Sequence, residues 1–363
     1  MRRPESGYTH TFPAVRGVQA GRPFYICMCP FRIIPKIFVF DEEEVPPELR
    51  AQRTLNTARI PAIVSYLLEN KADYVLSALT ASVDARVSFN SINDSGPGAN
   101  MGMLSIPMEA RILINDGQHR RAAIEAAIRE NPELSHENIP VLFFVDEGLI
   151  RSQQMFADLN KYAVRPSASL GVLYDHRQNS AELARYLALT VESFKGLVEM
   201  EKSSISNRST KLFTLSSIRN ANLSLLRKSR KDNATEEDRK LAAEYWTTVA
   251  ENIPDWKLAK EKKIPTSELR QQYVHAHGVA LHALGVAGSY LLSQHPKEWR
   301  TMLTKLRQID WSRSNTELWE GRAMVHGRIS KAKSNIILSS NVIKDVLRLE
   351  LTDEERALED SIK

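Results

Sequence analysis

The sequence has very little cysteine, since Cys27 and Cys29 are the only two among 363 residues. Side chains two positions apart in a strand point the same way but lie about 6.5–7 Å apart, too far for a ready local disulfide. No second cysteine pair and no compact histidine cluster supplies the further ligands of a metal or redox centre. We therefore expect two small, buried hydrophobic side chains on one face of a strand.

Long hydrophobic runs are also missing. No apolar segment approaches the roughly 20 residues that span a bilayer, and the first residues, Met1 to Ser6, lack the apolar core of a signal peptide. We expect a cytoplasmic protein with no membrane partner. The sequence also has no Gly-x-x-x-x-Gly-Lys-Ser/Thr loop, so any nucleotide hydrolysis would not be of the P-loop kind.

Positive charge is in modest excess, with 49 Lys and Arg against 44 Asp and Glu, but it is unevenly distributed. Residues 201–232 hold eight basic and two acidic side chains, residues 321–348 hold six and one, and residues 349–363 hold two and six. Two basic blocks favour a polyanionic partner, although solvated helix faces or a connector neutralised by the acidic tail would give the same counts. We predict DNA contacts from these side chains of the two blocks: Arg208, Lys211, Arg219, Arg227, Arg322, Arg328, Lys331 and Lys333.

Residues 203–226 interleave hydroxyl, amide and basic side chains with an apolar stripe at helical spacing. This pattern favours a helix that faces a DNA groove. The alternative is a capped helix with an ordinary solvated surface.

The apolar pattern predicts an α+β chain of two domains. Residues 1–23 are expected to be irregular, residues 24–170 to mix strands with helices, and residues 171–363 to be helical with loops near Asn207, Asp232 and Pro265. In the first domain we predict two short strands over 24–40, helices over 47–57, 59–70, 118–130 and 150–160, strands over 74–83 and 139–145, and a hairpin of 103–108 with 111–114.

The first domain is organised around the segment from Ile112 to Ile124, an apolar run that stops at a glycine and restarts as an alanine-rich helix. Backbone N–H groups at a helix start favour an anion, and arginines there suggest a phosphate partner. We predict a phosphate or nucleotide site formed by Asp116, Gly117, Gln118, His119, Arg120 and Arg121. The alternative is a charged helix start without chemistry, because Arg and Lys are common at such exposed positions.

Three histidines, His275, His277 and His282, belong to a strongly apolar stretch over residues 273–292. His275 and His282 are seven residues apart and share a helical face, and no carboxylate lies among them in the sequence. We favour a core or interface helix over a metal site, and predict no bound metal.

Several segments resemble the DGQHR-domain family, and within it the DNA sulfur-modification (phosphorothioation) proteins of the DndB type. In the first domain these are Asp116-Gly-Gln-His-Arg120, residues 139–144 and residues 156–166; in the second they are residues 211–215, 319–322, 327–331 and 351–355. The resemblance implies a protein encoded beside the enzymes that replace a DNA phosphate oxygen with sulfur. It implies a role outside that chemistry, as a DNA-binding repressor of the operon.

The first domain is more distantly similar to the ParB/sulfiredoxin-type fold, in which a Gly-x-x-Arg turn holds a nucleotide phosphate. Here the turn would be Gly117 to Arg120. Gln118 stands where sulfiredoxins have their reactive cysteine, so sulfinic acid reduction is not expected. Asn160 matches the asparagine of the Glu-Asn-x-x-Arg element of ParB-like CTPases, and it joins the predicted nucleotide site. No basic residue follows it three positions later, so metal binding there is not expected.

Three functions therefore follow as hypotheses. The first is a transcriptional repressor that binds promoter DNA, as a homo-oligomer because operators are commonly read by symmetric dimers. The second is a nucleotide-binding enzyme or switch that holds ATP or CTP at the turn; a nucleoside triphosphate is the one cofactor it would need. The third is a scaffold for the sulfur-modification enzymes.

Overall fold

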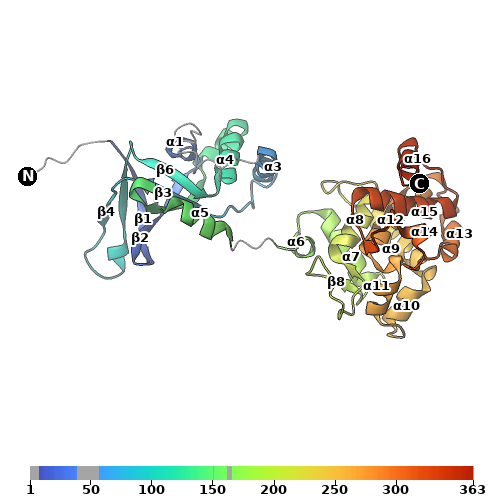
Figure 1. Cartoon of the computed structure of the whole chain (residues 1–363). Coiled ribbons are helices and arrows are strands. Elements are labelled where there is room, and N and C mark those ends of the chain that lie inside the picture. The colour runs from blue at the N-terminus through green and yellow to red at the C-terminus, as the bar shows by residue number, and fades with distance from the viewer. Residues whose placement is uncertain (1–7, 39–56, 150, 162–165, 363) are drawn as a thin grey trace, which may run out of the picture. The chain divides into compact units, whose positions relative to one another are not determined.

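A computed structural model describes residues 8–38, 57–149, 151–161 and 166–362 (Figure 1). The chain divides into two compact units, Met1–Val164 and Arg165–Lys363. Each has a hydrophobic core of its own. The predicted mixed α/β part followed by a helical part is confirmed. Among the described residues, no helix combines the length and the apolar character needed to cross a bilayer.

The first unit is built on a mixed sheet with the strand order β4-β5-β1-β2-β7-β3-β6. Neighbouring strands are antiparallel except β3 and β7, which are parallel. The strands are β1 (Thr9–Gln19), β2 (Arg22–Pro30), β3 (Leu79–Asp84), β4 (Ser88–Ser91), β5 (Met101–Pro107), β6 (Arg111–Asp116) and β7 (Asn138–Val145).

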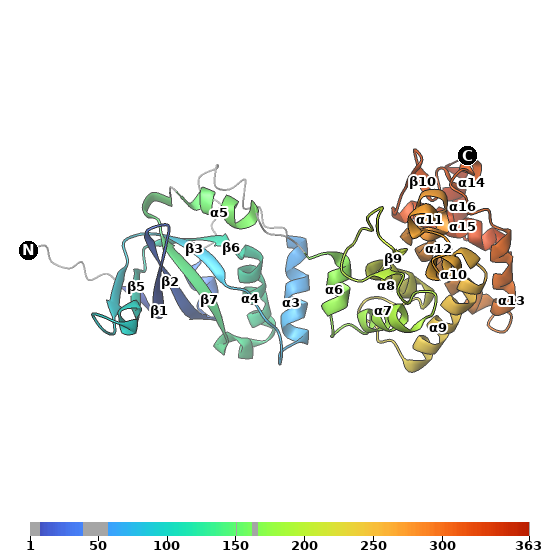
Figure 2. The same cartoon turned by 90° about the horizontal axis from the view of Figure 1, so that it is seen from below.

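Helices lie on both faces of this sheet, because Ser152 in the last helix bonds to Asn115, whose side chain points away from the core residues Ile112 and Ile114. The helices of the first unit are α1 (Ile34–Ile37), α3 (Ile60–Glu69), α4 (Gln118–Glu130) and α5 (Ser152–Lys161), with 3-10 turns at Thr57–Arg59, Pro97–Asn100, Pro132–His136 and Glu147–Leu149. α3 and α4 lie side by side (Figures 1 and 2) and share a core with α1 and with the buried residues of the strands. Cys27 and Cys29 are fully buried on the face of β2 that contributes to this core, as predicted. On the other face Ile26 and Met28 are exposed.

Three predictions for the first unit are wrong. Residues 9–19 are not irregular but form β1, which lies between β5 and β2. This segment contains Pro13, and proline is unusual in a central strand because it cannot donate a backbone hydrogen bond, so no strand was predicted. Residues 34–37 form α1 instead of a second strand after β2, because Pro35 fits the first turn of a helix.

The third wrong prediction is the hairpin. β5 pairs with β1 and β4, whereas β6 pairs with β3 at the far edge of the sheet. The connection through Met108, Glu109 and Ala110 lacks the Asn-Gly or Asp-Gly chemistry that closes a tight hairpin. The helix predicted over 47–57 lies almost entirely outside the described residues.

The second unit is helical. Its helices are α6 (Ala168–Tyr174), α7 (Asn179–Thr190), α8 (Leu215–Leu225), α9 (Glu236–Glu251), α10 (Pro254–Lys260), α11 (Thr266–Gln272), α12 (Gly278–Gln294), α13 (Trp299–Leu303), α14 (Thr316–Trp319), α15 (Lys333–Leu347) and α16 (Asp353–Asp360), with 3-10 turns at Val274–Ala276 and Thr304–Gln308. Two short strand pairs join β8 (Val198–Glu199) to β9 (Phe213–Thr214) and β10 (Met324–Val325) to β11 (Arg328–Ile329).

α12 is the central helix of this unit and packs against α8 and α15. It begins at Gly278, not at Tyr273 as predicted, so His275 and His282 do not share a helical face. His275 is buried in the preceding 3-10 turn, where its Nε2 lies 3.0 Å from a carboxylate oxygen of Asp255. That carboxylate comes from α10, which is why the local sequence did not reveal it.

We predict that both cysteines are unreactive in the native protein. Burial raises the pKa of each thiol to about 12, so the nucleophilic thiolate is absent near neutral pH. Both thiols should react with a thiol reagent once the first unit unfolds, which a titration along a urea gradient measures. Rapid labelling of either cysteine without urea would contradict their burial.

Candidate phosphate and nucleic-acid binding sites

The predicted turn joins β6 to α4 through Gly117. Its φ of +103° is a backbone conformation that residues with a Cβ rarely adopt. A Cβ on Gly117 would also lie 2.4 Å from Cδ2 of Leu79. The turn therefore requires glycine, both for its backbone conformation and for the close packing of the β6–α4 connection against the residue that begins β3.

Arg120 is held within the protein. Its Nη2 donates to a carboxylate oxygen of Asp116 at 2.9 Å and to the carbonyl oxygen of Ala78 at 3.0 Å. Its Nε is buried and has no hydrogen-bond partner among the described residues. The arginine thus reinforces the turn, and an incoming phosphate would compete with Asp116 for it.

Arg121 points to a different set of partners. Its Nη1 lies 2.7 Å from Glu125, which also pairs with Arg129 at 2.6 Å, and its Nη2 is 3.5 Å from the carbonyl oxygen of Pro35. These contacts link α4 to α1. Both arginines of the motif are therefore part of intramolecular networks.

The remaining predicted residues divide into two groups. Gln118 and His119 lie in the first turn of α4, where burial and the nearby Arg59 and Arg120 lower the pKa of His119. Asn160 lies near the end of α5, is exposed, and donates to the carbonyl oxygen of Phe156 in its own helix. The structure brings residues 116–121 together, but no described contact brings Asn160 to them.

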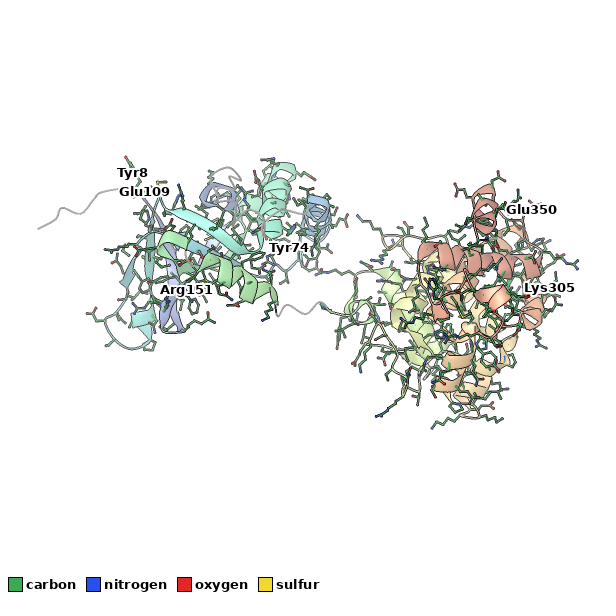
Figure 3. All side chains as sticks on the ribbon, in the orientation of Figure 1. Tyr8, Tyr74, Glu109, Arg151, Lys305 and Glu350 are labelled. Atoms are coloured by element: carbon green, nitrogen blue, oxygen red, sulfur yellow. The ribbon has the colours of Figure 1, made fainter. Side chains whose placement is uncertain are left out.

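A buried polar chain beside the motif escaped sequence analysis. Asn115 is fully buried; its amide nitrogen donates to the hydroxyl of Ser82 at 2.7 Å, and its amide oxygen accepts from Ser152 at 2.8 Å. These bonds fasten the start of α5 to β3 and β6. The backbone N–H of Arg151 (Figure 3) adds a bond of 3.0 Å to the buried Asp146. The only sequence feature that could have indicated this buried chain is Asn115 itself, which follows three apolar residues in β6.

In the second unit, three helices begin at the same end. A Cβ on Gly278 of α12 would meet Ser217 of α8, and a Cβ on Gly285 would meet Ala221. The contacts advance in the same direction along both helices, so α8 and α12 run parallel. Near the start of each helix, Lys333 of α15 and Val279 of α12 line the same groove. Eleven residues later in each helix, Lys344 of α15 lies over the ring of Tyr290 of α12. α15 therefore also runs parallel to α12, and the amino ends of α8, α12 and α15 gather on one side.

These helix starts form a groove of about 530 Å³. Lys333 lines it from the first residue of α15 and Lys331 from two residues before that helix, and Ser217, Asn220 and Ser224 line it from one face of α8. None of the lining residues is acidic. α12 and α15 have no side-chain cap, so their first backbone N–H groups point to this end without a capping acceptor. The groove therefore has the chemistry of an anion site.

The eight predicted DNA-contact residues lie in different surroundings. Lys331 and Lys333 line the groove, and Arg208, Arg227 and Arg328 are exposed. Lys211 donates to the carbonyl oxygen of Gly196 at 2.7 Å, and Arg227 lies over the ring of Tyr290. Arg219 is only 8% exposed, and Arg322 pairs with Glu359 at 2.7 Å.

The burial of Arg219 and the pairing of Arg322 differ from the surface role predicted for them. Arg219 lies on the buried side of α8, next to Ile218. The buried face of this helix is wider than the stripe of apolar residues that the sequence shows. Arg322 is covered by α16, whose acidic residues were seen in sequence only as a charged tail.

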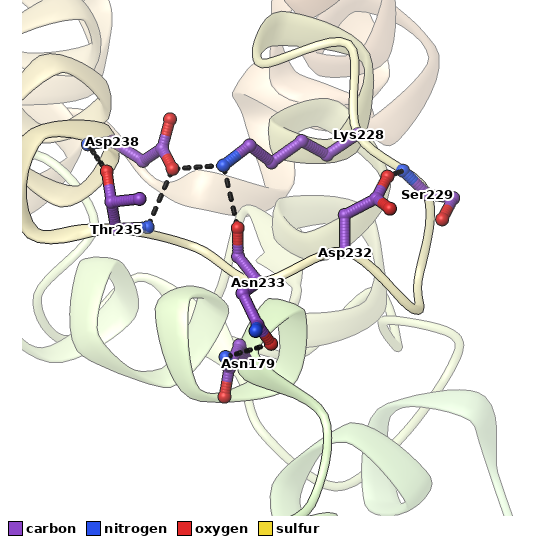
Figure 4. A network of polar contacts seen from close by, with 7 residues as sticks. All are labelled: Asn179, Lys228, Ser229, Asp232, Asn233, Thr235 and Asp238. Carbon is purple, nitrogen blue, oxygen red and sulfur yellow. Dashed lines mark hydrogen bonds and ion pairs between the residues drawn. The ribbon is translucent and has the colours of Figure 1, made fainter.

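The connection from α8 to α9 carries further basic residues that the prediction left out. Lys228 donates to the carbonyl oxygen of Asn233 at 2.7 Å and pairs with Asp238 (Figure 4). The N–H of Ser229 donates to Asp232, and Thr235 caps α9. These contacts order the loop around the exposed Arg230 and Lys231.

Comparison with known proteins identifies a family for nearly the whole chain. The family model DndB, described as DNA-sulfur modification-associated, matches residues 12–350. That range includes both the turn and the groove. No curated protein and no solved structure matches the chain. The distant similarity to the ParB/sulfiredoxin-type fold remains a prediction.

We predict that Gly117→Ala destabilises the first unit by about 2–4 kcal/mol, because the new Cβ combines a disfavoured φ with a clash against Leu79. All five tryptophans lie in the second unit and both cysteines in the first, so thiol labelling and tryptophan fluorescence report on different units. In urea, the labelling midpoint should fall more than the fluorescence midpoint.

Gly171→Ala is the matched control. Gly171 lies in α6, its φ is ordinary, and nothing lies within 4 Å of its added Cβ. Alanine should there be neutral or stabilising by about 0.5–1 kcal/mol. Equal labelling midpoints for the Gly117→Ala variant and the unchanged protein would contradict the requirement for glycine.

Proposed function

Because the chain belongs to the DndB family, described as DNA-sulfur modification-associated, we propose that it is a DNA-binding regulator that represses a DNA phosphorothioation operon. The observation that supports this best is the groove at the starts of α8, α12 and α15, which two lysines line and no acidic residue lines. The proposal assigns duplex DNA at the operon promoter as the partner of this groove.

The groove matches the groups that proteins use on DNA. Lysine, serine and asparagine side chains and helix N-termini are common phosphate contacts, which fix the register of a protein on the duplex. Ser217, Asn220 and Ser224 are spaced i, i+3 and i+7, so they form one polar face of α8. Asn220 offers the amide that pairs with adenine in direct readout.

Two exposed arginines extend this basic surface. Arg328 lies in β11, and the preceding Gly327 accepts a 2.8 Å hydrogen bond from Arg313, which lines a neighbouring cavity. Arg208 follows Asn207, which lines the same cavity. We propose that both contact phosphates on either side of the groove, and that two copies of the chain read a symmetric operator.

The turn at Gly117 supports the nucleotide hypothesis less well. Arg120 and Arg121 are already paired with Asp116 and Glu125, so a triphosphate would have to replace carboxylates that lie next to them in the same helix or turn. A scaffold role with the modification enzymes is compatible with the family. It requires neither the groove nor the turn at Gly117 to bind a ligand.

We predict that Lys333→Gln weakens binding to the promoter fragment and lowers the slope of log affinity against log salt by about one unit, because one phosphate contact is lost. Lys297→Gln is the control, since Lys297 is exposed, lines neither cavity and removes the same charge. A mobility-shift series at several salt concentrations measures both variants.

Two results would count against DNA regulation at this groove. One is equal affinity of the unchanged protein for the promoter fragment and for random duplex. The other is an identical salt slope for the two variants.

A further inference from the structure

A second cavity of about 320 Å³ adjoins the groove. The two share Ser217, Gly278 and Lys331, so Lys331 lines both. The wall of the smaller cavity is mostly polar, with hydroxyl and amide side chains from residues 203–207 and from Gln271. Three cationic side chains line it, Arg270, Arg313 and Lys331, and none of its lining residues is acidic.

Arg270 is fixed in place without a counter-charge. It is 8% exposed and donates to the carbonyl oxygens of Ser206, Asn207 and Ser209 at 3.0–3.2 Å, and to that of Lys211. Carbonyl oxygens satisfy its N–H groups but bring no net negative charge. A buried guanidinium without a carboxylate leaves the cavity at positive potential.

Arg313 is held in the same way. It donates to the carbonyl oxygens of Arg270 and Gln271, both at 3.2 Å, and to that of Gly327 at 2.8 Å. Two guanidinium groups thus lie near one another with only backbone acceptors around them. No lining residue supplies a carboxylate to offset their charge, so a bound anion would be favoured there.

His277 adds a hydrogen-bonding group and no charge. Its Nε2 donates to the carbonyl oxygen of Arg270 at 2.7 Å, which leaves Nδ1 as an acceptor. The pKa of His277 is lowered to about 4, chiefly by burial and also by the charges of Arg313, Lys331 and Arg270, while the hydrogen bond to Arg270 raises it. The ring is therefore neutral at pH 7.

Lys331 is the cation available to a ligand. Its ammonium makes no hydrogen bond or ion pair with any residue in the described part of the chain. Its Nζ would lie 3.5 Å from a Cβ on Gly278, so it reaches over the start of α12. An ammonium in this position can turn its three donors toward either cavity.

We propose that the smaller cavity binds a phosphomonoester of about mononucleotide size, whose phosphate pairs with Lys331. A phosphomonoester carries a charge of about −1.5 to −2 at pH 7, which offsets more of the three positive charges than a carboxylate does. The cavity volume is at the lower end of small-ligand pockets of about 300–1,000 Å³ and exceeds what a lone phosphate fills. The serine, asparagine and glutamine side chains are partners for the polar body of such a ligand.

The shared lysine also connects this ligand to DNA, a step that rests on the proposed function. A phosphate bound to Lys331 in the smaller cavity removes that charge from the groove. The ligand therefore weakens DNA binding and acts as an inducer. Because the coupling equals the loss of one phosphate contact, we expect an effect of about tenfold on affinity at low salt.

The direct test is calorimetry of the full chain with AMP, CMP, GMP and UMP, and with inorganic phosphate and adenosine as partial probes. At least one nucleotide should bind more tightly than phosphate, and adenosine should not bind. Lys331→Gln should lower the affinity at least about tenfold, because a charge-assisted hydrogen bond is lost. Lys331→Arg should retain binding, and Lys333→Gln, which changes only the larger groove, should leave it unchanged.

The outcomes separate the two proposals. No heat from any phosphate probe, or binding that Lys331→Gln does not reduce, overturns the cavity assignment. Nucleotide that binds but leaves the mobility shift of the promoter fragment unchanged overturns the coupling. A protein that binds nucleotide through Lys331 but binds no DNA overturns the proposed function and leaves the cavity assignment standing.

Discussion

The close packing of α8 against α12 is the constraint on which the helical unit depends. A Cβ on Gly285 would lie 2.3 Å from the carbonyl oxygen of Ala221, and a Cβ on Gly288 would lie 2.7 Å from Cδ1 of Leu225, both in α8. Without side chains at these positions the two parallel helices approach closely at each glycine. Parallel packing places their positive ends together, which is unfavourable for the helices themselves. Lys331 and Lys333 add to that charge, so this end of the unit is suited to an anion before any ligand arrives.

The motif in the first unit has the opposite electrostatic character. Its arginines carry positive charge, but Asp116 and Glu125 neutralise them within the same connection. Both arginines are paired within the first unit, apart from their buried Nε atoms. The phosphate site at this turn stays a prediction, and the basic segment before α15 offers cations that are less engaged within the protein.

Sequence analysis succeeded where the signal was local. The strand, glycine and helix around Gly117 follow from adjacent residues, and the alternation in β2 correctly buried both cysteines. It failed where distant segments decide the outcome. No local feature shows that β6 pairs with β3 instead of β5, or that Asp255 meets His275. Arg219 and Arg322 are of a residue type that is usually exposed. Only the packing of α8 shows that Arg219 is buried, and only the packing of α16 shows that Arg322 is paired with Glu359.

The strand order of the first unit has a consequence for how the protein folds during synthesis. β1 and β2 form a hairpin in the middle of the sheet, and their outer partners are β5 and β7. An isolated two-stranded hairpin is marginally stable, so it must wait on the ribosome until residues 101–107 and 138–145 have emerged. During that interval both long edges of the hairpin are open to pairing with other chains. The β7 strand, the last strand of the sheet to be made, closes one of these edges before α5 follows in the chain.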